Sequence, residues 1–213
     1  MFGYQIAILL AATILIPCLV GFIRFNTLAL HYKLVAILAG IGFLTELLMF
    51  SLPYFGTNNL IGMHFYALAE IILLSMFFIH QLKEPVEKRI IWIATIAIAA
   101  ISLVYSSVGN NIKEFNSLPR AIECIYFGGL CSYVFYEVSI DKSRMEGGLC
   151  FINGAILFYF SSCFIVFAFS KYKAPDKDDL LMMYNVHSII NAICNLAFAA
   201  GLWVAPRTSY RAV

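Results

Sequence analysis

Long runs of apolar residues, separated by short polar segments, follow one another along the whole chain. A bilayer core of about 30 Å requires roughly 20 mostly apolar residues in each helix that crosses it. Seven stretches reach this length, and we predict one helix in each: 2–23, 32–54, 60–82, 90–108, 118–139, 148–170 and 180–204. The connections between them are too short to hold a soluble domain. The pattern therefore predicts an all-α, polytopic membrane protein, with one seven-helix transmembrane domain over residues 1–213.

Composition agrees with the membrane class. Hydrophobic residues make up 62% of the chain and charged residues 12%, whereas a soluble domain has about 25% charged residues. The stretch 2–23 lacks a basic region before its apolar run, which is long for a signal peptide, so we predict a retained helix, kinked at Pro17. A net charge of +2 without a long basic run gives no sign of a nucleic-acid-binding surface.

The distribution of lysine and arginine predicts the orientation, because positive charge favours the cytoplasmic side. With the N-terminus outside, the inner segments hold Arg24, Lys33, Lys83, Lys88, Arg89, Lys142, Arg144, Arg207 and Arg211. The outer segments then hold Lys113, Arg120, Lys171, Lys173 and Lys177. The inner side has the larger share, so we predict an outside N-terminus and a cytoplasmic C-terminus, in a plasma or inner membrane.

Five ionisable residues inside the predicted spans fall at a similar depth, in the outer half of the bundle. They are Glu46, His64, Glu70, Glu123 and His187, from four different spans. A charged side chain at the bilayer centre costs at least about 2.5–3.5 kcal/mol, so such groups usually face the bundle interior or a wet cavity. Arg120 stands one turn before Glu123, and we expect the two to pair at the outer membrane interface.

The last span carries a polar stripe that begins in the segment YNVHSIINAICNL. At 100° per residue, the stripe occupies an arc of roughly 120° on one helix face. Its residues are Tyr184, His187, Ser188, Asn191, Cys194, Asn195 and Phe198. The opposite face is mostly isoleucine, which suits lipid or helix packing. We therefore expect the stripe to turn inward, toward the carboxylates.

Helix faces indicate which spans enclose this site. Tyr66 and Glu70 form an (i, i+4) pair on one face, whereas His64 projects about 120° away from Glu70. Small residues should let neighbouring backbones approach near the polar layer; these are Gly40, Gly42, Gly128 and Gly129. The spans expected to enclose the site are 32–54, 60–82, 118–139 and 180–204, with help from 148–170. The nearly apolar span 90–108 is expected at the periphery or in a dimer contact.

The favoured functional hypothesis is a sensor or transporter for a small polar or cationic ligand, or for protons. Buried carboxylates serve as counter-charges and proton acceptors in such proteins, and an imidazole titrates near neutral pH and can act as a switchable partner. The expected binding residues are Glu46, Tyr66, Glu70, Glu123, His187, Asn191 and Asn195. Membrane lipids and a second copy or another membrane protein are the expected partners.

Two alternatives remain open. One is a membrane-embedded, metal-dependent enzyme acting on a lipid-like substrate, although the chain lacks an HExxH or ExxH pair. Its candidate metal ligands are Glu46, His64, Glu70, Glu123 and His187, and no catalytic residue is assigned. The other is a structural subunit of a larger membrane complex, in which the polar layer only joins helices.

Two kinds of seven-helix membrane protein are excluded at the residues that define them. A retinal protein, which this chain resembles only in outline, needs a lysine in its last helix for the Schiff base, and 180–204 contains none. A covalent retinal pigment is therefore excluded, and no cofactor is predicted other than a metal ion under the enzyme hypothesis. Ceramidase-like hydrolases need three zinc-binding histidines with an aspartate and a serine. This chain has two deep histidines, His64 and His187, and no aspartate inside a predicted span.

Overall fold

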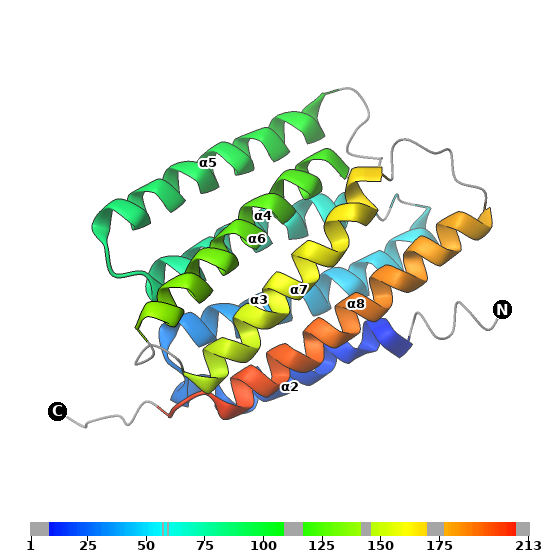
Figure 1. The fold of residues 1–213 in the computed structure, drawn as a ribbon. Coiled ribbons are helices and arrows are strands. Elements are labelled where there is room, and N and C mark those ends of the chain that lie inside the picture. The colour runs from blue at the N-terminus through cyan, green and yellow to red at the C-terminus, as the bar shows by residue number, and fades with distance from the viewer. Residues whose placement is uncertain are drawn as a thin grey trace.

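A computed structural model describes residues 9–56, 58, 60–108, 117–141, 146–169 and 177–207, with backbone only for residues 53, 166–169 and 177–184. Over these residues the chain forms seven α-helices and no strand. Figure 1 shows the helices running roughly along one common direction as a single bundle. Several predicted features lie outside the described residues: the side chains of Tyr184 and Lys177, and all of Lys113, Lys142, Arg144, Lys171, Lys173 and Arg211.

Each helix overlaps one of the predicted spans. The helices are α2 (Leu15–Arg24), α3 (Leu30–Ser51), α4 (Leu60–Gln81), α5 (Pro85–Ser107), α6 (Ser117–Ile140), α7 (Gly147–Phe169) and α8 (Lys177–Val204). Short 3-10 helices are η1 (Ala12–Ile14), η2 (Phe25–Thr27) and η3 (Leu52–Phe55). The all-α prediction is confirmed for the described residues.

Six helical segments of the described chain are long and apolar enough to cross a membrane, which supports a multi-pass membrane protein. They are Leu9–Thr27, Leu30–Ser51, Leu60–Gln81, Pro85–Ser107, Gly147–Ile165 and Asn185–Val204. Helix α6 has 24 residues, but it also carries Arg120, Glu123 and Glu137. These charged residues lower its apolar character, and α6 does not belong to the six.

Two helix starts show how local sequence shapes the spans. The 3-10 turn η1 lies one turn before Pro17, whose ring nitrogen cannot donate the hydrogen bond that an α-helix requires there. Helix α5 begins at Pro85, five residues before the predicted span, because proline is well suited to the first turn of a helix. The first turn of α5 is polar, so a prediction from apolar residues alone placed the start of this helix too late.

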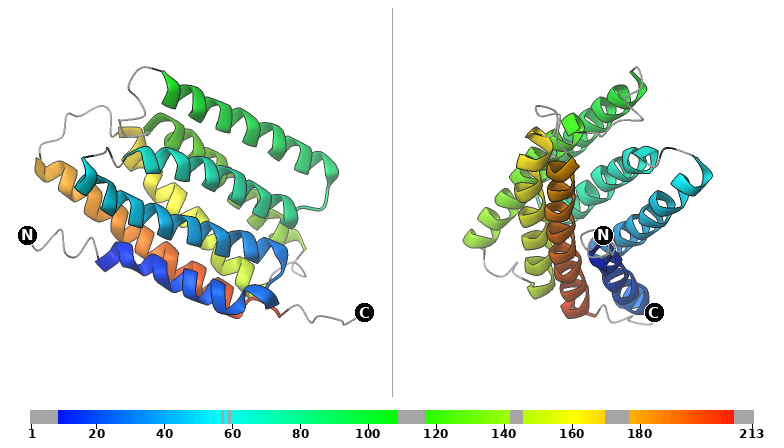
Figure 2. Two further views of the ribbon diagram at one scale, coloured as in Figure 1. Left: turned by 180° about the vertical axis from the view of Figure 1, so that it is seen from behind. Right: turned by 90° about the vertical axis from the view of Figure 1, so that its right-hand side faces the viewer.

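The packing divides the helices into two groups. One group contains α2, α3 and α4, the other contains α6, α7 and α8, and the contact between α2 and α8 joins them. Helix α3 packs against α2 and α4, while α7 packs against α6 and α8, and α8 also packs against α2. Figures 1 and 2 place α5 at the edge of the bundle, beside α4 and α6. Its exposed apolar side chains, such as Ile93 and Ile96, suit contact with lipid. This is the peripheral position expected for 90–108.

Aromatic side chains fill the middle of the bundle. Five of the largest are almost completely buried: Tyr32, Phe77, Phe78, Phe127 and Phe160. The Phe127 ring lies between its neighbours, with centroid distances of 6.0 Å to Phe78 and 4.9 Å to Phe160. These contacts join α4, α6 and α7 into one core. The polar residues described below lie beside this core.

A close helix approach occurs between α7 and α8. A Cβ atom added at Gly201 would lie 2.9 Å from the carbonyl oxygen of Gly148 and 2.6 Å from Ile152. Only glycine allows the two backbones to come this near. The expectation of close packing is wrong at Gly40, Gly128 and Gly129, because an added Cβ atom at any of these positions meets nothing within 4 Å. Sequence alone does not say which glycines face a neighbour.

At the end of the bundle opposite the N-terminus, Arg24 joins the first helix to the last. Its guanidinium donates hydrogen bonds to the carbonyl oxygens of Leu202 (2.7 Å), Trp203 and Ala205 (2.8 Å). The first two carbonyls belong to the last turn of α8, where they have no partner within the helix, and Ala205 directly follows the helix. The positive charge also lies at the negative end of the helix dipole. Only 9% of Arg24 is exposed, so this predicted cytoplasmic charge is a buried cap.

Candidate functional site

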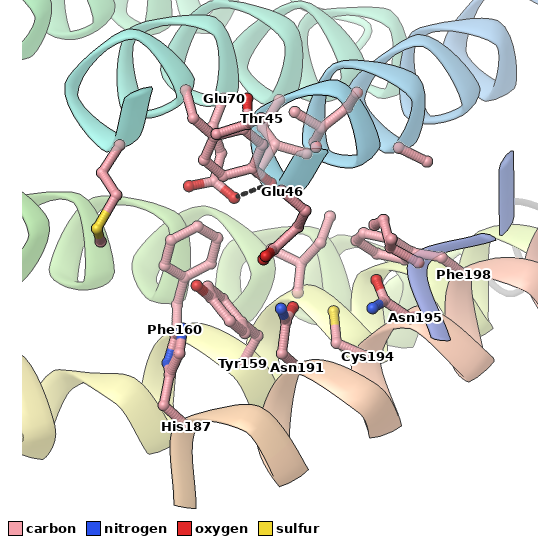
Figure 3. A pocket seen from close by; sticks show the side chains of 18 of the residues that line it. Thr45, Glu46, Glu70, Tyr159, Phe160, His187, Asn191, Cys194, Asn195 and Phe198 are labelled. Carbon is pink, nitrogen blue, oxygen red and sulfur yellow. Dashed lines mark hydrogen bonds between the residues drawn. The ribbon is translucent and has the colours of Figure 1, made fainter. Parts of the chain in front are cut away.

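A cavity of about 340 Å³ lies between the two groups of helices. Figure 3 shows Glu46 and Glu70 extending into it from α3 and α4 on one side, and side chains of α7 and α8 extending from the other. Arg120 of α6 and Ile14 of η1 complete the lining. The polar lining residues are Thr45, Glu46, Tyr66, Glu70, Arg120, Tyr159, His187, Asn191 and Asn195.

Six of the seven predicted binding residues line this cavity. They are Glu46, Tyr66, Glu70, His187, Asn191 and Asn195. The seventh, Glu123, is 1% exposed and lies behind Arg120 rather than at the cavity surface. In the described part of the stripe on α8, Cys194 and Phe198 also line the cavity, while Ser188 is buried beside it. The stripe therefore turns inward, as its spacing suggested.

A buried ion cluster joins α4 to α6 at one wall of the cavity. The Arg120 guanidinium donates to Glu123 Oε2 at 2.7 Å and to Glu70 Oε2. No more than 6% of any of these three side chains is exposed. The expected pairing of Arg120 with Glu123 is present, and the pair is buried inside the bundle. The side chain turns inward because two carboxylates compensate its charge inside the bundle.

Tyr66 extends this cluster toward the cavity. Its hydroxyl donates to Glu70 Oε1 at 3.1 Å, and its ring lies 5.7 Å from the Arg120 guanidinium carbon, within cation–π range. Both oxygens of Glu70 therefore have a donor. By contrast, Glu123 Oε1 is buried without a hydrogen-bond partner. One guanidinium thus serves two carboxylates, and their combined formal charge is negative when both are ionised.

Three other polar groups face the cavity without a hydrogen bond or ion pair to any described residue. They are the Glu46 carboxylate of α3, the Tyr159 hydroxyl of α7 and the Asn191 amide of α8. In Figure 3, Glu46 extends toward Tyr159 and Asn191, which extend from the opposite wall. Polar groups inside a membrane bundle are costly when unsatisfied. These three are therefore the groups available to a ligand.

The other polar side chains of α8 that line the cavity contact residues of neighbouring segments. His187 Nδ1 lies 3.5 Å from Cys163 Sγ, and the His187 ring centroid is 6.0 Å from that of Tyr159. Asn195 Nδ2 donates to Thr13 Oγ1 at 3.1 Å. This bond places the segment before α2 against one end of the cavity. His187 and Asn195 thus help to hold α7, α8 and the N-terminal segment around the space.

His64 does not join the site. Its Nδ1 lies 2.7 Å from Ser106 Oγ on α5, on a different side of α4 from Glu70, in agreement with the predicted offset of the two faces. Within the described ranges, no three His, Cys, Asp or Glu side chains are grouped closely enough to hold a metal ion. The five candidate metal ligands divide instead: Glu46 and His187 face the cavity, Glu70 and Glu123 bind Arg120, and His64 faces α5.

No protein-family model, curated protein or solved structure matches this chain. Functional inference therefore depends on the cavity itself. Three of its polar residues were not among the predicted binding residues: Thr45, Arg120 and Tyr159. The (i, i+3) spacing of Arg120 and Glu123 indicated their pairing, but nothing in the sequence indicated that Arg120 reaches Glu70. Tyr159 lies in an apolar span without a polar stripe, so the sequence offered no sign of the direction it faces.

Proposed function

We propose that this chain is an integral membrane sensor or transporter that binds a small polar or cationic ligand, or protons, in the cavity. The observation that carries the proposal is the Glu46 carboxylate, which faces the cavity and has no hydrogen bond or ion pair to a described residue. Glu46 is partly buried, and a carboxylate inside a membrane bundle is stabilised by a counter-charge, a donor or a proton. Arg120, the only lysine or arginine of the described lining, already serves Glu70 and Glu123.

The roles of the three glutamates differ in this proposal. Glu70 and Glu123 hold Arg120 in place, and so stabilise one wall of the cavity. Glu46 is the counter-charge or proton acceptor, and Asn191 and Tyr159 orient the ligand beside it. Tyr66, Asn195 and His187 support these groups through their contacts with Glu70, Thr13 and Cys163.

We further propose seven membrane crossings, with α6 spanning as well, and an outside N-terminus. The bias of positive charge supports this orientation and is not altered by burial: without the buried Arg24 and Arg120, the inner segments keep eight lysines and arginines and the outer segments keep four. The cavity lies toward the end of the bundle at which α3 ends and α4 and α6 begin. In the proposed orientation this is the outer half.

Ligand binding can be tested by thermal unfolding of the purified protein in detergent, with a panel of small organic cations and neutral polar molecules. Glu46→Gln keeps the side-chain shape and removes the charge. Glu84→Gln is the matched control, because Glu84 is exposed before α5 and its side chain does not cap the helix. We expect a ligand that raises the midpoint of the wild type and of the control variant, but raises that of Glu46→Gln much less. A panel without such a ligand would contradict the proposal.

A second experiment distinguishes a transporter from a sensor. Wild-type protein and Glu46→Gln are reconstituted in vesicles, and uptake of the radiolabelled ligand found in the first experiment is measured. A transporter gives saturable uptake that Glu46→Gln abolishes and Glu84→Gln preserves. A sensor gives Glu46-dependent binding without uptake.

A further inference from the structure

The geometry points to the class of ligand. Resting on the proposed function, we propose that the cavity takes an amine with a single positive charge and an apolar body, and that it excludes molecules carrying a carboxylate. Three features of the cavity lead to this conclusion: the groups around Glu46, the apolar remainder of the lining, and the charge state of the opposite wall.

The polar groups near Glu46 match the donors of an ammonium. A primary ammonium has three N–H donors and no acceptor. The Glu46 carboxylate, the Tyr159 hydroxyl oxygen and the Asn191 amide oxygen offer three acceptors from three helices. The Asn191 amide can present its oxygen by rotation, since the two ends of an amide are nearly equivalent in shape. The same three groups would leave a purely apolar ligand with unsatisfied polar neighbours.

The rest of the described lining is mostly apolar. It includes Leu38, Met63, Leu74, Ile156, Phe160 and Phe198. A volume of about 340 Å³ falls at the lower end of the range for small-molecule sites, roughly 300–1,000 Å³. A fully polar ligand would lose its hydration against this lining without replacement. A ligand with one charged end and an apolar body suits both parts of the cavity.

A ligand carboxylate finds no free cation at this site. Arg120 is the only lysine or arginine that lines the cavity within the described residues, and its guanidinium already binds Glu70 and Glu123. The carboxylate would instead face Glu46 and Glu70. A second ammonium would also lack a partner, because both oxygens of Glu70 accept hydrogen bonds from Arg120 and Tyr66. The charge balance therefore favours one positive charge and no negative one.

Three probes with the same phenyl body test this inference: 2-phenylethylamine, which is a cation, 2-phenylethanol, which is neutral, and phenylalanine, which is a zwitterion. Dissociation constants are measured by titration calorimetry with the wild type, Glu46→Gln and Glu84→Gln in the same detergent. We expect the wild type to bind the amine at least about tenfold more tightly than the alcohol, which corresponds to about 1.4 kcal/mol. Glu46→Gln should abolish this preference, Glu84→Gln should keep it, and phenylalanine should not bind.

The outcomes separate the ligand class from the broader proposal. Equal binding of amine and alcohol, binding of phenylalanine, or an amine preference that survives in Glu46→Gln would each overturn the inference. If the amine bound only to the detergent, its apparent dissociation constant would be the same with all three proteins. That result would also contradict the proposed amine class. A failure of all three probes also overturns the amine class, whereas the proposed function fails only if the wider panel yields no Glu46-dependent ligand.

Discussion

Replacing Arg120 with methionine tests the ion cluster most directly. Methionine keeps an unbranched side chain of similar reach and removes the guanidinium that binds Glu70 and Glu123. Both carboxylates would then remain in the bundle interior, where no more than 6% of either side chain is exposed. The free energy of unfolding should fall, because two like charges would lose their common counter-charge.

The size of this loss follows from the burial of the cluster. Breaking a buried ion pair by removing one partner costs about 3–5 kcal/mol, which is roughly a hundredfold to several-thousandfold in the folding equilibrium. Glu123→Gln should cost less, about 1–2 kcal/mol, because its amide oxygen can still accept from Arg120. Replacing the whole cluster, as Arg120→Met with Glu70→Gln and Glu123→Gln, should recover more than half of the single-variant loss, since no uncompensated charge remains.

The assay is equilibrium unfolding in mixed micelles of increasing denaturing detergent, followed by tryptophan fluorescence and circular dichroism. The single, conservative and triple variants are compared at one pH and one protein concentration. An Arg120→Met protein as stable as the wild type would refute the cluster as a stabilising element. A triple variant as unstable as Arg120→Met would show that arginine acts through its packing and not through its charge.

Four other changes should give distinct results in thermal unfolding in detergent. Arg24→Met removes three hydrogen bonds from the end of α8 and should cost about 3 kcal/mol, whereas Lys83→Met breaks an exposed pair with Asp141 and should cost less than about 1 kcal/mol; equal midpoints would contradict the capping role. Gly201→Ala should lower the midpoint, because its Cβ atom would overlap the backbone of α7. Gly40→Ala should raise the midpoint slightly, because alanine has the higher helix propensity and its Cβ atom meets nothing within 4 Å. The gain in the free energy of unfolding should be up to about 1 kcal/mol.

The level of a polar residue along its own helix could be predicted from sequence, and its neighbours on other helices could not. Apolar length fixes how far each residue lies from the end of its helix, so Glu46, Glu70 and His187 were expected at one level, and all three line one cavity. Helix periodicity also separated His64 from Glu70 correctly, because the two lie on different faces of one helix. These predictions concern single helices, for which length and periodicity are sufficient.

The order of the helices around the bundle was the missing information. Arg120 lies near the start of α6, so its position along the helix indicated the membrane interface, and only the packing of α4 beside α6 reveals Glu70 as a second partner. The same limit applies to Gly148 and Gly201, whose contact depends on α7 lying against α8. Whether the residues around Glu46 bind a ligand remains a prediction, for the experiments above to test.

The capping of α8 by Arg24 has a consequence for the order in which the protein matures during synthesis. The ribosome delivers α2 early, but the carbonyl oxygens that accept from Arg24 belong to Leu202 and its neighbours, 178 residues later. Asn195 and Thr13 are likewise far apart in the chain and bonded in the bundle. The hydrogen bonds of Arg24 therefore cannot form before α8 has been synthesised. The cavity wall that α8 supplies is likewise the last part of the site to be synthesised, so the cavity and the cap on α8 are completed by the same helix.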